Sequence, residues 1–406
     1  MEDRQRLHGS RGKAPILPEA YLSVLDRVFR RVVDENLGIE EQRVAAPALL
    51  AELSGLSESQ QKLLIRNAGR YHTWAVAEEL LVQARRGWAE DPRHSEALAQ
   101  LALEVADRLE VEGFRKRLLN DLKAEAWSYI GNCRRIQSDL HQAQAAFGQA
   151  ELLLSQGSGD RVERARLLDL RASLVGDFRD FGSAIELLTE ALEAYRAARD
   201  RHHEGRALMK KAKLLRDSGK VEETIPLLER AATLLEVERE PWLAFALKKN
   251  LVIHLMEAGR AEEAQRLVPE VRELAREHAS RLERLRLLWT EGLLCKSLGQ
   301  TELAIEALKQ VRDGFVAAQI GFDVALVSLD LATLYLESDR TQEVRNLAVE
   351  SVPLFASRGV HREVVMAWSL FREAAERDAV TLGLVQEVAS RIRHAQPRPS
   401  GPADSL

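Results

Sequence analysis

Proline, glycine, cysteine and aromatic residues are all scarce in this sequence. Its 406 residues include 11 prolines, 23 glycines and 2 cysteines, and aromatic side chains make up 5%. Alanine, leucine, glutamate and arginine are abundant instead, and these residues are strong helix formers. The scarcity of helix breakers through the middle of the chain therefore predicts an all-helical protein.

Other absences narrow the class of function. No apolar run approaches the ~20 residues that cross a bilayer, and the N-terminus lacks the apolar stretch of a signal peptide, so we expect a cytoplasmic protein without membrane contact. Cys133 and Cys295 fit no metal-ligand spacing and are expected to be reduced, buried thiols. The net charge is only -5 and no long block of like charge occurs, so direct nucleic-acid binding is not expected.

The motifs of common catalytic sites are absent as well. The glycines form no phosphate-binding loop, and no His-Glu-x-x-His motif is present. His202-His203-Glu204 is the one local histidine cluster, and we expect solvated residues of an inter-repeat loop there, with a metal site as the minor alternative. We therefore predict a protein that is not an enzyme and that uses no cofactor and no metal.

A step of 40 residues runs through the chain. Its turns recur at Arg179, Gly219, Gly259, Gly299 and Asp339, and the Gly or Asp found at four of these positions suits a left-handed helix end. Small or apolar residues keep the same step seven positions before these turn residues, at Ala172, Ala212, Val252, Gly292 and Ala332. A second series follows five positions after them, at Ala184, Thr224, Ala264, Ala304 and Val344. Small residues allow two helices to cross closely, as Ala304 and Gly292 are expected to do, and a strict step indicates a stacked solenoid.

One earlier unit shows what kind of repeat this is. Trp127, Gly131, Ala143, Phe147 and Ala150 stand at the offsets of a tetratricopeptide repeat. Between residues 70 and 394 the chain thus resembles the tetratricopeptide repeat (TPR) family, with units longer than that family's about 34 residues. The resemblance implies a right-handed α-solenoid of stacked antiparallel helix pairs. The runs 201–208 and 321–332 are also similar to uncharacterised bacterial helical-repeat proteins, which implies regulation or signalling.

Segments outside the array have simpler predictions. Residues 18–69 are expected to form capping helices, the first with Tyr21 and Leu25 on its apolar face. Ser57 begins a capping box, and Asp160 is placed to cap a helix within the array. The segments 1–17 and 395–406 are expected to be disordered tails, because they contain little apolar surface to bury.

The TPR resemblance also implies a binding surface. In that family the first helix of each unit lines a concave groove, at positions one, four, five and eight residues after the unit's start. The unit that starts at Gly205 places Arg206, Met209, Lys210 and Lys213 there. The unit that starts at Ala124, two units earlier, contributes Asn132, and the unit that starts at Phe245 contributes Lys249 and Asn250. Arg206 and Lys210 match two basic residues with which some members hold a peptide's carboxylate. Ser128 and Leu170 depart from the complete pattern.

These residues suggest a basic groove for an acidic segment of a partner protein. The alternative is ordinary solvated helix faces with charge pairs between neighbours. The leading hypothesis is a protein-protein interaction module or scaffold that binds a peptide or helix in its concave groove. The second is a peptide-sensing regulator whose ligand changes the curvature of the solenoid, and an enzyme ranks third.

Overall fold

A computed structural model of the chain describes residues 38–88, 90–350, 362–377 and 379–394. The described residues contain helices and connecting turns and no strand. The tails predicted at 1–17 and 395–406 lie outside the described residues, as does the apolar helix predicted around Tyr21. Residues 38–53 are helical, and the capping box at Ser57 is confirmed, since its side chain accepts from the backbone N–H of Gln60.

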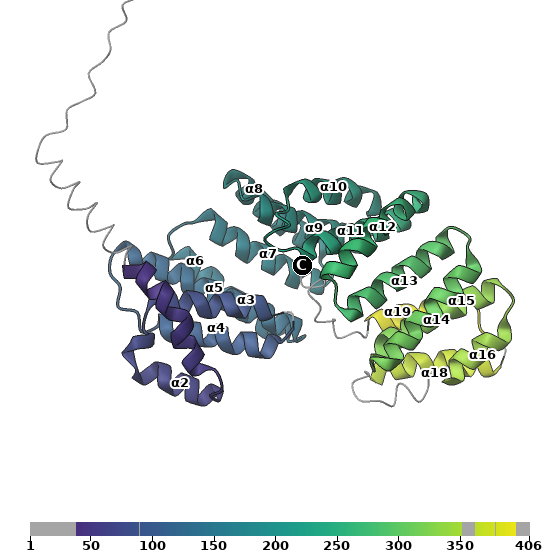
Figure 1. Cartoon of the computed structure of the whole chain (residues 1–406), viewed down its shortest axis with the longest axis horizontal. Helices are drawn as coiled ribbons and strands as arrows, with labels where there is room; N and C mark the ends of the chain where they lie inside the picture. The colour runs from purple at the N-terminus through teal and green to yellow at the C-terminus, as the bar shows by residue number, and fades with distance from the viewer. Residues whose placement is uncertain (1–37, 89, 351–361, 378, 395–406) are drawn as a thin grey trace, which may run out of the picture. The chain divides into compact units, whose positions relative to one another are not determined.

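The chain divides into two compact units, which are described separately here. The first comprises the described part of residues 1–83 with residues 100–110, and the second comprises residues 84–99 with the described part of 111–406. The boundary predicted near residue 69 stays a prediction. The labelled helices of Figure 1 are α2 (Glu58–Asn67), α3 (Trp74–Gly87), α4 (Pro92–Ala106), α5 (Phe114–Ile136), α6 (Leu140–Ser155), α7 (Arg161–Asp177), α8 (Phe181–Ala197), α9 (Arg201–Asp217), α10 (Thr224–Leu234), α11 (Trp242–Glu257), α12 (Ala261–His278), α13 (Arg281–Ser297), α14 (Thr301–Ala317), α15 (Gly321–Glu337), α16 (Thr341–Glu350), α18 (Arg362–Glu376) and α19 (Leu382–His394).

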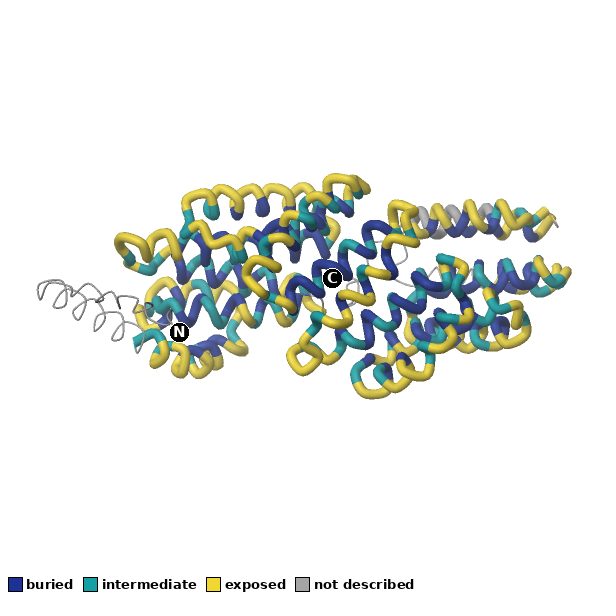
Figure 2. Tube along the Cα trace, turned by 90° about the horizontal axis from the view of Figure 1, so that it is seen from above, coloured by how far each residue is buried: buried dark blue, intermediate teal, exposed yellow. Residues whose placement is uncertain are grey.

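Within the second unit, consecutive helices pair in an antiparallel manner (Figure 1). The 40-residue step comes from the helix lengths, because α13, α14 and α15 each have 17 residues and connections of three residues separate them. Second helices such as α8 and α14 bury one side and expose the other, whereas the first helices α11 and α15 are buried or half-buried along almost their whole length (Figure 2). The predicted class, an all-α solenoid of stacked antiparallel helix pairs, is confirmed.

The left-handed turn residues are also confirmed. The backbone φ angle is +84° at Gly219, +74° at Gly259 and +73° at Gly299, and it is +63° at Arg179 and +56° at Asp339. Ser138, one repeat earlier, has a φ of +65°. At each of these places one helix ends at a left-handed residue and the next helix begins a few residues later. The same backbone conformation therefore recurs with the 40-residue step.

Glycine should stabilise the turns that lack it. Arg179→Gly should raise the free energy of unfolding by about 1 kcal/mol, and Gly259→Ala should lower it by about 1 kcal/mol, because only glycine adopts a positive φ without strain. Urea unfolding of both variants measures the two effects. The control is Ala258→Gly, a change at a φ of -80°, and a similar gain of stability there would contradict the explanation.

Close helix crossings occur where the sequence places glycine. A Cβ atom added at Gly131 would lie 3.0 Å from the ring of Phe147, and one added at Gly292 would lie 3.0 Å from the side chain of Leu308. The two crossings are equivalent and four repeats apart. The atoms nearest to a Cβ at Gly292 belong to Leu308 and Ala307, and the packing of Ala304 opposite Gly292 stays a prediction. Ala304 itself is fully buried.

A buried histidine joins two neighbouring repeats. His254 of α11 is 1% exposed, and its Nδ1 lies 2.7 Å from the hydroxyl oxygen of Thr224 in α10. That hydroxyl donates to the carbonyl oxygen of Val221 at 2.7 Å, so Nδ1 carries a hydrogen and donates to Thr224. Burial, together with the positive charge of Arg216, lowers the pKa of His254 to about 3.

The low pKa of His254 makes stability depend on pH. The unfolded chain takes up the proton near its usual pKa of about 6.5, while the folded chain does so only near 3. The stabilising contribution is therefore complete above about pH 6.5 and decreases by about 2 kcal/mol between about pH 7 and pH 5. His254→Gln should remove that decrease from urea unfolding measured at both pH values, with His141→Gln as the control. The same pH dependence in wild type and His254→Gln would contradict this account.

Candidate functional site

Polar side chains gather where the first helices of successive repeats adjoin. We call the following set the inner polar cluster: Asn132 and Arg135 of α5, Arg166, Asp169 and Asp177 of α7, Tyr195 of α8, His202, Arg206 and Lys210 of α9, and Glu240 before α11. Helix α7 contacts both α5 and α9, which brings residues about one repeat apart together. The whole cluster belongs to the second unit.

Ion pairs connect neighbouring repeats within this cluster. The Nζ atom of Lys210 lies 3.0 Å from Asp169, and Nη1 of Arg135 lies 3.2 Å from Asp177. Arg206 is bound to Glu240, with a shortest distance of 2.7 Å between its Nη1 and the carboxylate. Burial lowers the pKa of Lys210, and the neighbouring Asp169 opposes that shift. Three cations of the cluster are therefore neutralised by carboxylates of the chain itself.

This pairing corrects the prediction of an exposed basic face on α9. Lys210 is only 5% exposed, Met209 is buried in the apolar core, and Arg206 and Lys213 are half-buried. Arg206 and Lys210 are therefore not free cations. The first helices pack closely enough for opposite charges about one repeat apart to form ion pairs. Whether these residues bind a partner stays a prediction.

Of the other predicted site residues, Asn132 belongs to this cluster, and Lys249 and Asn250 lie on the next first helix, α11. Asn132 is fully buried, and its Oδ1 accepts from Nε of Arg135 at 3.0 Å. Lys249 of α11 is buried with its Nζ 5.5 Å from the ring centroid of Phe245, and Asn250 is half-buried. The structure thus connects Asn132 to Lys210 through residues of α7, and it places Lys249 and Asn250 on the next first helix.

The histidine cluster differs from its prediction. His202, His203 and Glu204 are buried in the first turn of α9, because Asp200 caps this helix and starts it before them. Nδ1 of His203 lies 2.7 Å from Asp200, and burial lowers the pKa of His203 to about 4. Among the described residues no group of His, Cys, Asp and Glu is arranged to hold a metal ion.

Several buried polar atoms of the cluster have no hydrogen-bond partner. They are Nδ2 of Asn132, Nε of Arg166, the hydroxyl of Tyr195 and Nε2 of His202. Such atoms are rare in folded proteins, because an unsatisfied buried polar group costs about 1–3 kcal/mol. A fifth atom of the cluster, Oδ1 of Asp169, also has no hydrogen-bond partner but is in the ion pair with Lys210, and two further atoms of this kind among the described residues lie outside the cluster, on Gln42 and Ser95. The unsatisfied atoms therefore concentrate in the inner polar cluster.

Burial also shifts the ionisation of the surrounding groups. It raises the pKa of Tyr195, so this phenol keeps its proton at neutral pH. It raises the pKa of Glu163 to about 7, although the adjacent Arg166, whose Nη1 lies 2.7 Å away, favours the charged form. The cluster is therefore a place where polar groups are held with little solvent around them.

The carboxylates of the cluster were not predicted, although the sequence contains a signal for two of them, Asp169 and Asp177. Opposite charges recur at a separation of 41 or 42 residues, close to the repeat step. The pairs that the structure brings together in this way are Arg135 with Asp177, Asp169 with Lys210, Arg216 with Glu257, and Lys296 with Glu337. Tyr195 carries no comparable signal, because it comes from a second helix.

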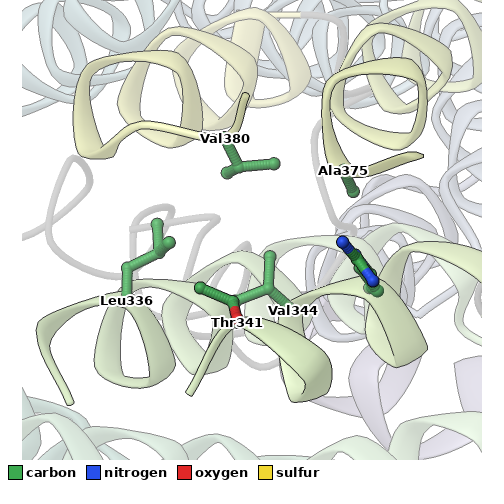
Figure 3. Close-up of a pocket in the computed structure, with 6 residues that line it drawn as sticks. Leu336, Thr341, Val344, Ala375 and Val380 are labelled. Atoms are coloured by element: carbon green, nitrogen blue, oxygen red, sulfur yellow. The ribbon is translucent and has the colours of Figure 1, made fainter. Parts of the chain in front are cut away.

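A small cavity lies elsewhere in the second unit. Leu336, Thr341, Val344, Ala375 and Val380 line it together with Arg345 (Figure 3). Its volume is about 30 Å³. A single water molecule needs about 10–15 Å³, so this cavity is too small for a peptide or a cofactor.

No protein-family model and no curated protein matches the chain in sequence. Solved structures do match in fold. A Rap protein complexed with Competence and Sporulation Factor is 13% identical, with a TM-score of 0.57 over 79% of this chain and 88% of that one. Aspartyl phosphate phosphatase F from Bacillus subtilis is 14% identical, with a TM-score of 0.53 over 86% and 87%, and the apo form of RapI is 13% identical, with a TM-score of 0.50 over 78% and 99%.

These matches establish the class of fold. The chain is a TPR-like helical-repeat protein, as the resemblance of the unit from Trp127 to Ala150 implies. Identities this low concern architecture alone. Among the described residues no helix is both long and apolar enough to cross a bilayer.

Proposed function

We propose that this chain is a protein-protein interaction module of bacterial regulation, which binds an extended segment of a cytoplasmic partner at the inner polar cluster and catalyses no reaction. The observation that supports it most is the concentration of unsatisfied polar atoms on Asn132, Arg166, Tyr195 and His202. A group that costs stability when it has no partner is suited to bind one. The similar fold of a Rap protein, whose structure holds Competence and Sporulation Factor, is consistent with this proposal.

A peptide-sensing regulator is the second candidate, and burial favours it. Asn132 and Tyr195 are fully buried between helices, so a ligand that reaches them has to move the first helices apart. Repeats contact only their neighbours, so such a movement changes the curvature of a solenoid. The partner's segment and the sensed peptide would occupy the same cluster.

Affinity purification of the full chain separates these candidates. A macromolecule recovered from the source cell's lysate and identified by mass spectrometry supports the scaffold. A small peptide released from the purified protein by denaturation supports the sensor. Recovery of neither, at protein concentrations high enough for micromolar binding, would contradict the proposed function.

Tyr195→Phe is the sharpest variant for this site. It removes only a hydroxyl that has no partner, so the variant should be as stable as wild type or up to about 1–2 kcal/mol more stable in urea unfolding. The same change should weaken partner binding by about 10-fold, because the hydroxyl is then missing from the complex. Tyr335→Phe is the matched control, because Tyr335 of α15 is buried in a separate apolar cluster formed by helices α14, α15, α16, α18 and α19. Equal binding by wild type and Tyr195→Phe would exclude this cluster as the site.

A further inference from the structure

The unsatisfied atoms of the inner polar cluster also indicate what a ligand must offer. We infer that the cluster holds a peptide segment through the segment's uncharged backbone carbonyl oxygens, and that the ligand's net charge contributes little. This inference rests on the proposed function and specifies the chemistry of its ligand. Two observations support it: apart from Oδ1 of Asp169, which is in the ion pair with Lys210, the unsatisfied atoms of the cluster are hydrogen-bond donors, and the four cations of the cluster have carboxylate partners.

Hydrogen bonds fix the donor character of two of these groups. The Oδ1 atom of Asn132 accepts from Arg135, so the amide is oriented with Nδ2 as its unsatisfied end. Nδ1 of His202 accepts from the backbone N–H of Glu236 at 3.3 Å, so a neutral imidazole carries its hydrogen on Nε2. The nearest carboxylate oxygen, on Glu240, lies 3.7 Å from Nε2, which is too far for a hydrogen bond.

The remaining two groups are donors by their chemistry. Arg166 uses Nη1 to bind Glu163 at 2.7 Å and leaves its Nε–H without a partner. The hydroxyl of Tyr195 stays protonated in its buried position and can donate its hydrogen. Four donors from helices of three successive repeats therefore need oxygen acceptors, and an extended chain supplies carbonyl oxygens at regular intervals along its length.

The charges of the cluster argue against recognition of an acidic ligand. Lys210, Arg206, Arg135 and Arg166 are paired with Asp169, Glu240, Asp177 and Glu163. A ligand carboxylate would have to displace one of these partly buried carboxylates, which would then lose the cation that it binds. A backbone carbonyl oxygen satisfies the free donors and leaves all four ion pairs in place.

An affinity selection with the full chain tests this inference. The probe is an equimolar pool of random octapeptides that are acetylated at the N-terminus and amidated at the C-terminus, so that neither end is charged. Selection is performed at about 50 mM and about 500 mM salt, because raising the salt weakens binding between charges much more than binding to neutral carbonyls. Tyr195→Phe and Tyr335→Phe are selected in parallel.

We expect retained peptides that are not enriched in Asp or Glu and whose Kd changes less than about twofold between the two salt concentrations. Replacing single carbonyl oxygens of the best peptide by sulfur, a weaker acceptor, should raise the Kd by about 3- to 10-fold at two or more positions. Tyr195→Phe should bind that peptide about 10-fold more weakly than Tyr335→Phe does.

The other outcomes are distinguishable. Retained peptides that are rich in Asp and Glu and are lost at high salt would overturn this inference and leave the proposed function intact. Tight binding that tolerates every carbonyl replacement would overturn it as well. If the wild-type chain retains no peptide at either salt concentration, the proposed peptide binding itself is overturned, together with this inference.

Discussion

Lys210→Met should lower the free energy of unfolding by about 3–5 kcal/mol, because it leaves the carboxylate of Asp169 without its cation between α7 and α9. The methionine side chain is close in length, so lost packing contributes little to this effect. Urea unfolding followed by circular dichroism measures the change. An exposed lysine would give a change below about 1 kcal/mol, so the size of the effect also tests whether Lys210 is buried.

The double variant Lys210→Met/Asp169→Leu is the control for that experiment. Replacing both members of a buried ion pair by apolar residues of similar volume is often neutral, so most of the lost stability should return. The two changes are then strongly non-additive, as expected of residues in contact. If each single change and the double change cost about the same small amount, the pair does not stabilise the junction between repeats.

Ala304→Arg has the second largest expected effect. Ala304 is fully buried in α14, so an arginine there would overpack the crossing of two helices and bury an unpaired charge. The expected loss is about 2–4 kcal/mol in the free energy of unfolding. The neighbouring Leu303 is 62% exposed, and Leu303→Arg should change stability by less than about 0.5 kcal/mol.

The pair of variants tests the helical register directly. The same side chain is introduced at adjacent positions, and only the face of α14 differs. Thermal unfolding should show a melting temperature several degrees lower for Ala304→Arg and almost unchanged for Leu303→Arg. Equal melting temperatures would mean that the 40-residue register places the wrong residues between the helices.

The repeat itself could be predicted because its signals are local. A left-handed residue at Gly219, Gly259 and Gly299 depends only on the backbone of the turn, and small residues such as Gly131 depend only on the partner helix of the same unit. Helix caps such as Asp160 are local too, and its side chain accepts from the backbone N–H of Val162 at 2.7 Å. The prediction of a solvated loop at His202–Glu204 was wrong, because Asp200 is the N-cap of α9 and these residues form the first turn of that helix.

The sequence by itself thus determined the fold class and the repeat length, because short-range backbone conformation and helical periodicity decide these properties. Only the tertiary structure decided the state of the polar residues. No carboxylate close in the sequence identifies a partner for Arg206 or Lys210, because their carboxylate partners lie 34 and 41 residues away. Whether such charges pair, and whether Asn132 or Tyr195 keeps a donor unsatisfied, depends on which helices are neighbours and how closely they pack.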